Sequence, residues 1–510
     1  MSSKTNKWVA RAALVMLPFI FACSGSATST STDSDTETAT AAFPSTLALS
    51  SPYSYEEAAN ASVSSSLIKA ATSGGYVSSY VVATAEIEAL LSATSAGSCS
   101  FDPEDFLATS DDADCYGPAL PYENHPDSAG GTDDGELPPG DVGIWNETDA
   151  TTGHACSAAE LNAQMDGVSA KTKASLKGLA SIICVINTNG LSMPSSSTLD
   201  VTAEMTALAI ADTTFSGVTL SHEINADGND QYTYNLDFTY TPGADPYDVV
   251  VEMDHVPGST AGEYQGRLSY LVNSYMTGGN CPTRDITVNG SVLYESASLT
   301  ALALQAREGS FCGHDSDGRT DSLVDPALKY DAASLTTGWG NNFSIFTAEF
   351  DPSSMEGNYS YTWQAGPQDN FTRTFNLNVN DSSEGVSFYG FGDDIEDTDG
   401  SVAGFICNWA GPNNDHTLQD YSQRQEMSFD SSLGLVVSDA ADFIYAPTNT
   451  CDYDGTGTFT YDTDLDGVVD SDPLAVVANE LLGLTDADVD GVFDEMAAAG
   501  FSLPVAPDNL

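Results

Sequence analysis

The residues with the clearest potential for chemistry are two short acidic repeats late in the sequence. Both read Asp-x-Asp-x-Asp-Gly-x-apolar-Asp, and the second begins 24 residues after the first (486 − 462 = 24). Ca²⁺ takes six to eight oxygen ligands, so acids at positions 1, 3 and 5 of a tightly curled loop can converge on it, with Gly allowing the turn and the next carbonyl joining. The spacing predicts two calcium sites with the ligands Asp462, Asp464, Asp466, Val468, Asp470, Asp486, Asp488, Asp490, Val492 and Asp494.

These repeats resemble the first nine positions of EF-hand and dockerin calcium loops. The resemblance implies a small paired-loop module over 462–510, with Val469 and Phe493 packing between the loops. Pro473 and Ala497 stand where an EF-hand has its bidentate glutamate. This departure implies weak, extracellular-type sites with affinities of about millimolar. Ca²⁺ is the one cofactor we expect, and docking of the module to a protein partner is a further possibility to test.

The start of the sequence has the pattern of a secretory signal. Lys4, Lys7 and Arg11 precede an uncharged, mostly apolar stretch over residues 12–22. This stretch has the length of a signal-peptide core, whereas a membrane-spanning helix needs about 20 residues. Residues 1–22 are therefore predicted to be a signal peptide.

That signal ends in Ile20-Phe21-Ala22-Cys23, which resembles the lipobox of bacterial lipoproteins. The resemblance implies cleavage before Cys23, acylation of that cysteine and attachment to a lipid bilayer. Ser24 follows the cysteine, which by the family's sorting rule implies the outer membrane. Residues 23–45, rich in Ser, Thr, Ala and Asp, are predicted to be a disordered tether because they cannot bury a core.

The remaining cysteines are predicted to form disulfides. Nine minus the anchor leaves eight, an even number in an oxidising compartment. We favour the pairs Cys99–Cys115, Cys281–Cys312 and Cys407–Cys451. Cys156–Cys184 would be about 40 Å apart along a straight helix, so that pair requires a break near Gly167.

Residues 46–197 are predicted to be a helical and loop-rich region. Ser157 to Glu160 form a capping-box pattern, and Gly190 is a plausible helix stop. Apolar residues follow at mostly helical spacing, which favours a core-facing helix. They are Leu161, Met165, Val168, Leu176, Leu179, Ile183 and Ile186.

Residues 198–461 change to a period of two, which predicts an antiparallel β domain. Alternation is clearest over 232–240 and 371–379, and similar runs occur at 215–224, 247–255, 264–275, 286–295, 343–350, 357–365, 401–409 and 456–461. One apolar and one polar face indicate a sandwich, a closed barrel, or a curved sheet wrapped around a helix. The fold class is therefore mainly β, with a helical segment before the sheet.

Charge excludes some functions and leaves others open. The chain has 14 basic and 74 acidic residues, a net charge of −60. Nucleic acid binding is disfavoured because it needs clustered Lys and Arg. The acidity fits either a solvated surface suited to a saline habitat or cation binding. Zinc-protease, serine-hydrolase and P-loop motifs are absent from the sequence.

Taken together, these patterns favour a lipid-anchored envelope protein with a structural or binding role, stabilised by calcium. A carrier of an apolar ligand is an alternative, motivated by the Tyr- and Phe-rich strands. A secreted hydrolase that uses two carboxylates in a cleft is another. The sequence identifies no catalytic residue and no protein or ligand partner.

Overall fold

The computed structural model describes part of the chain. The described residues are 42–57, 72–73, 76–109, 120–121, 145–149, 152–155, 157–260, 262–274, 286–312, 343–364, 372–381, 384–392, 421–430, 435–438, 442–447, 451–453, 459–461, 476–478, 496–497 and 499–507. The predicted lipidation site and the calcium-loop ligands lie outside these residues.

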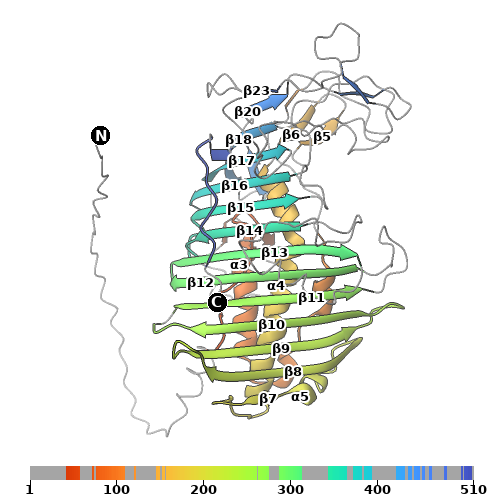
Figure 1. Ribbon diagram of the computed structural model, residues 1–510, viewed down its shortest axis with the longest axis vertical. Helices are drawn as coiled ribbons and strands as arrows, with labels where there is room; N and C mark the ends of the chain where they lie inside the picture. The colour runs from red at the N-terminus through yellow and green to blue at the C-terminus, as the bar shows by residue number, and fades with distance from the viewer. Residues whose placement is uncertain are drawn as a thin grey trace, which may run out of the picture.

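A single antiparallel sheet dominates the molecule (Figure 1). It has 15 strands, in the order β23-β20-β18 and then down in sequence order to β7, with β19 also paired to β18. Its strands are β7 (Thr198–Asp200), β8 (Thr213–Ile224), β9 (Asp230–Tyr240), β10 (Tyr247–Pro257), β11 (Tyr264–Ser274), β12 (Ile286–Ser298), β13 (Ala301–Cys312), β14 (Phe343–Phe350), β15 (Gly357–Gln364), β16 (Thr372–Asp381), β17 (Glu384–Gly392), β18 (Tyr421–Asp430), β19 (Leu435–Ser438), β20 (Asp442–Pro447) and β23 (Val476–Ala478).

The other elements in the described part of the chain are helices and three small sheets, β1-β3-β2, β4-β6-β5 and β21-β22. The helices are α3 (Ser79–Leu91), α4 (Ser157–Thr188) and α5 (Thr202–Thr206), with 3-10 turns η1 (Ala96–Ser98) and η2 (Pro103–Leu107). The short strands are β1 (Tyr55–Glu57), β2 (Thr72–Ser73), β3 (Tyr76–Ser78), β4 (Leu120–Pro121), β5 (Trp145–Asp149), β6 (Thr152–Ala155), β21 (Cys451–Tyr453) and β22 (Phe459–Tyr461).

The predicted fold class is confirmed: a mainly β protein with a helical segment before an antiparallel sheet. Of the three arrangements considered, the structure has a sheet lying over a helix (Figure 1). We call the face toward α3 and α4 the inner face and the opposite face the outer face. The β9 alternation is as predicted, since Tyr232, Tyr234, Leu236, Phe238 and Tyr240 are all buried on the inner face.

Helix α4 runs across the strands, and its length matches the sheet. Its 32 residues span about 48 Å, which is about ten strand spacings of 4.8 Å. It accordingly contacts β8 and β9 near one end of the sheet and β16 and β17 further along. All seven apolar residues predicted to face the core are buried. The helix ends as predicted, with Gly190 at φ 65° and the Leu191 amide bonding the Ile186 carbonyl.

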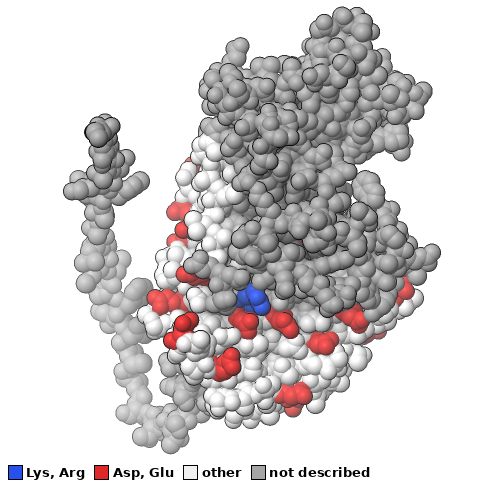
Figure 2. Space-filling model, in the orientation of Figure 1, with Lys and Arg blue, Asp and Glu red and all other residues white. Residues whose placement is uncertain are grey.

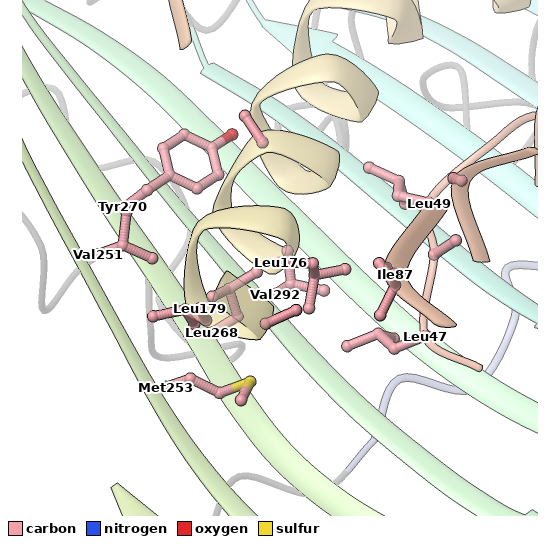
Figure 3. Close-up of a cluster of buried hydrophobic side chains, with 14 of the residues drawn as sticks. Leu47, Leu49, Ile87, Leu176, Leu179, Val251, Met253, Leu268, Tyr270 and Val292 are labelled. Atoms are coloured by element: carbon pink, nitrogen blue, oxygen red, sulfur yellow. The ribbon is translucent and has the colours of Figure 1, made fainter. Parts of the chain in front are cut away.

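One hydrophobic core joins the helical segment to the sheet. Leu176 and Leu179 of α4 lie against Val251, Leu268 and Val292 of the inner face, as Figure 3 shows. On the other side of α4, Ile87 of α3 packs together with Leu47 and Leu49. Helix α4 is thus enclosed by the sheet and by the layer of α3 and residues 42–53. That enclosure explains why every residue from Ala180 to Ile186 is fully buried.

The disulfide pairing differs from the prediction. Cys99 is bonded to Cys184, with their Cα atoms 5.5 Å apart, so the favoured pair Cys99–Cys115 is wrong, and Cys184 is not available for the pair with Cys156 that required a helix break. The chain after α3 returns to the end of α4, and α4 runs unbroken through Gly167. The favoured pairs Cys281–Cys312 and Cys407–Cys451 lie outside the described side chains.

Several strands were not predicted from their sequences. Ala301–Cys312 is rich in helix-forming residues, yet it forms β13 between β12 and β14. Glu384–Gly392 and Tyr421–Asp430 form β17 and β18 without a clear apolar alternation. The run at 401–409 lies outside the described residues. No helix in the described part of the chain is both long enough and apolar enough to cross a membrane.

Candidate functional site

An open pocket lies at one end of strands β8–β12, on the side of the sheet rim where β8 turns into β9 and β10 turns into β11. It has a volume of about 710 Å³ and is lined by residues 228–230, 256–259, 263–265 and 295–297. These residues come from the β8–β9 turn, the β10–β11 turn and the end of β12, which the antiparallel pairing brings to the same edge. We call it the turn-edge pocket.

Local hydrogen bonds hold the two turns that form the pocket. In the β8–β9 turn, the Asn225 side-chain oxygen accepts from the amides of Asp227 and Asn229. In the β10–β11 turn, the Gly258 amide donates to the Glu263 carbonyl at 2.7 Å. Bonds of these two kinds, from the Asn225 side chain to the backbone and between backbone groups of one turn, fix turns without help from distant parts of the chain. The pocket walls are therefore positioned by the turns themselves and by the strands they connect.

The pocket carries only negative formal charge among its described lining residues: three carboxylates, Asp230, Glu263 and Glu295, and no Lys, Arg or His. The Glu263 carboxylate accepts from the Thr260 amide and the Ser259 hydroxyl. Hydrogen bonds from Thr260 and Ser259 hold the pKa of Glu263 below its usual range. Asp230 Oδ1 lies 2.8 Å from His222 Nε2, within hydrogen-bond distance.

The buried side of the pocket is aromatic. Tyr264 lines the pocket and is buried beneath it, and burial raises the pKa of its phenol to about 12. Its hydroxyl bonds that of Thr46 at 2.8 Å. Behind it, His255 Nδ1 lies 3.3 Å from the Tyr294 hydroxyl. Because the phenol of Tyr264 stays protonated at neutral pH, it can donate a hydrogen bond or pack against a ligand, but it cannot serve as a base there.

A second polar cluster lies inside the protein, between α4 and the sheet. Lys171 Nζ donates to the carbonyls of Ala108 and Gly167 at 2.7 and 3.3 Å, and lies 3.4 Å from Glu308 Oε1. The Tyr270 hydroxyl donates to Glu308 Oε2 at 2.6 Å. Burial, followed by the charge of Glu308, raises the pKa of Tyr270 well above its usual value. Every donor of this cluster that is described has an acceptor within the protein, so it fits a structural link between α4, β11 and β13.

A third cluster joins α3 to α4. Glu86 Oε2 lies 3.1 Å from Lys173 Nζ and 3.2 Å from Lys177 Nζ. Burial alone would raise the pKa of Glu86, but the two lysines outweigh it and leave that pKa below its usual value. Because the Glu86 carboxylate pairs with both lysines where α3 meets α4, this cluster also fits a structural role.

None of these three clusters was predicted from the sequence. One signal was available: of the chain's 14 basic residues, three lie within positions 171–177. The turn-edge pocket gave no local signal, because its residues are spread over 228–297 and meet only through strand pairing.

None of the predicted site residues that the structure describes lines the turn-edge pocket or belongs to the two polar clusters. Cys23 and the ten calcium-loop positions lie outside the described residues. Within the described part, no group of three or more His, Cys, Asp or Glu side chains is arranged to hold a metal ion. Of the disulfide candidates, the structure brings Cys99 and Cys184 together.

No protein-family model, no curated protein sequence and no solved structure matches this chain.

Proposed function

We propose that this protein is a lipid-anchored envelope protein with a binding role, and that the turn-edge pocket takes a small organic cation. The observation that carries the proposal is the pocket lining, which has three carboxylates and, among the described residues, no basic side chain. The charge of the whole chain, −60, would concentrate cations around it and speed their capture. Figure 2 shows acidic side chains scattered over one face of the described part, with little basic surface between them.

Binding accounts for the pocket better than acid–base catalysis does. A general acid at neutral pH needs a carboxyl whose pKa is raised, usually by burial. Glu263 has the opposite property, since its pKa is lowered by hydrogen bonds and its side chain faces water. A carboxylate that stays ionised favours attraction of a cation over donation of a proton. This comparison favours a binding protein over the carboxylate hydrolase.

An apolar-ligand carrier has less support. Such a carrier needs an apolar cavity of about 300 Å³ or more. The inner face that would hold the ligand is instead covered by side chains of α4, α3 and residues 42–53 (Figure 3). The turn-edge pocket, the cavity on which we base the proposal, has a mixed polar lining.

Two parts of the proposal rest on the sequence alone. Lipidation at Cys23 rests on the lipobox resemblance, and calcium binding at 462–494 rests on the repeated spacing. Mass spectrometry of the protein from bacterial membranes tests the first, with an acylated Cys23 expected at the new amino terminus. Calcium titration of the mature chain tests the second, with Asp464→Asn and Asp488→Asn expected to weaken binding, and unchanged binding contradicting it.

The pocket is tested by calorimetric titration of the mature chain with spermidine. We expect the triple variant Asp230→Asn, Glu263→Gln, Glu295→Gln to bind at least about 10-fold more weakly, equivalent to about 1.4 kcal/mol. The matched control, Glu252→Gln, Glu349→Gln, Glu384→Gln, removes the same charge at exposed positions outside the pocket lining. Equal losses in the two variants would mean that spermidine senses net charge alone, and the proposal would fail.

A further inference from the structure

A short segment, residues 499–507, lies across the outer face of β15–β17 (Figure 1). We call it the strap. Phe501 packs on Phe388 of β17, with ring centroids 5.8 Å apart. The side-chain amides of Asn358 on β15 and Asn376 on β16 both donate to the Ser502 carbonyl at 2.8 Å. The strap is thus held by one aromatic contact and by two side chains that converge on a single backbone oxygen.

The strap has the periodicity of a polyproline II helix. Phe501, Pro504 and Pro507 are buried, whereas Leu503 and Val505 are 42% and 72% exposed. Burial at every third residue matches a helix of three residues per turn. The described strap forms no strand pairing with the sheet. Side chains on the sheet therefore recognise an extended backbone without adding it as another strand, which is the general mode by which proline-containing peptides are bound.

The contact leaves hydrogen-bonding capacity unused. The side-chain oxygens of Asn358 and Asn376 are buried beside the strap without a described hydrogen-bond partner, and Asn376 is fully buried. A buried acceptor without a donor is costly and uncommon. The strap cannot supply donors at its two prolines, because proline has no backbone N–H. An occupant with a suitably placed donor would satisfy these oxygens and gain affinity over the strap.

We propose that the outer face of β15–β17 is a docking groove for an extended, proline-containing segment of another polypeptide, and that the strap is its built-in competitor. The groove is defined by Asn358, Asn376 and Phe388. The inference is independent of the turn-edge pocket, which lies at the turns of other strands.

The experiment uses the mature chain and a fluorescein-labelled peptide with the sequence of residues 499–507. Phe501→Asp in the chain introduces a charge at the buried anchor and is expected to release the strap. Fluorescence anisotropy should then show saturable peptide binding at least 10-fold tighter than to the unaltered chain, whose own strap competes. Leu503→Asp is the matched control: it places the same charge on an exposed strap residue and should leave peptide binding as in the unaltered chain.

Two further variants identify where the peptide binds. In the Phe501→Asp chain, Asn376→Leu should reduce the affinity for the unaltered peptide at least 10-fold. A peptide carrying Phe501→Ala should lose affinity for the Phe501→Asp chain by the same factor. Circular dichroism checks that each chain is folded, and Phe501→Ala replaces Phe501→Asp if the latter is not. Peptide affinities that are the same for the unaltered and strap-released chains, or that ignore Asn376, would overturn the proposal.

Discussion

Tyr270 and Glu308 are hydrogen-bonded across an intervening strand, at 2.6 Å between the phenol and Oε2. In the strand register, Tyr270 on β11 pairs with Gly290 on β12, and Gly290 pairs with Glu308 on β13. Residues two strands apart are separated by about 9.6 Å, so the middle position must lack a side chain for the phenol to reach over it. The same arrangement occurs in the opposite direction, where Tyr294 crosses Gly266 toward His255.

Gly290→Ala is expected to destabilise the protein, because the added Cβ would overlap the Tyr270 ring. Overpacking of this kind costs about 1–3 kcal/mol, and it would also displace the phenol from Glu308. Urea unfolding of the purified chain measures the effect. Gly243→Ala is the control, since a Cβ there meets nothing within 4 Å. A change at Gly290 as small as that at Gly243 would contradict the crossing geometry.

Lys171→Met is expected to cost about 3 kcal/mol, because it leaves the charge of Glu308 without its partner in a largely buried place. The double variant Lys171→Met, Glu308→Leu should recover part of this loss, since it removes both charges. Denaturant unfolding of the four chains gives the coupling energy. If the two single losses simply add, the ion pair between α4 and β13 is not an energetic link.

Replacing Cys99 and Cys184 together by Ala is expected to lower stability by about 2–5 kcal/mol, because the bond closes a chain loop with a sequence separation of 85. Peptide mapping under non-reducing conditions should recover a Cys99–Cys184 linked pair. Recovery of Cys99 linked to Cys115 instead would support the pairing favoured from sequence and contradict the structure.

Glu86→Gln is expected to destabilise the α3–α4 contact at pH 7 by about 1.5–3 kcal/mol, the range for hydrogen bonds to charged groups. The pKa of Glu86 is lowered in the folded state, so its contribution is present above its ordinary pKa of 4.5 and disappears as pH falls through the lower folded value. The difference between the variant and the unaltered chain should therefore shrink in acid. Unfolding midpoints measured from pH 7 to pH 3 check this.

Glu56 is near the same two lysines, but its pKa shifts in the opposite direction, so it serves as a control. Burial raises the pKa of Glu56, so its ionised form is penalised in the folded protein at pH 7. Glu56→Gln should leave stability at pH 7 unchanged or increase it. If both variants lose the same amount of stability at pH 7, the direction of the pKa shift does not determine the effect of either substitution.

Features that depend on residues close together in the sequence could be predicted, whereas features that depend on distant residues could not. The apolar stripe from Leu161 to Ile186 was enough to identify α4, because helical spacing is a local property that burial of one face then uses. The alternation from Tyr232 to Tyr240 identified β9 in the same way. By contrast, the local propensity of Ala301–Cys312 favours a helix, and pairing with β12 and β14 on both sides overrides it.

The sequence by itself determined the mainly β class, the long helix before the sheet, and the acidic character that favours cations. Only the tertiary structure decided that Cys99 meets Cys184, that Lys171 meets Glu308, and that acids from three separate turns and strand ends share one pocket. The physical reason is that periodicity reports which face of an element is buried, whereas these contacts depend on strand register and on the path of the chain across α4. Both are set by the packing of the whole core.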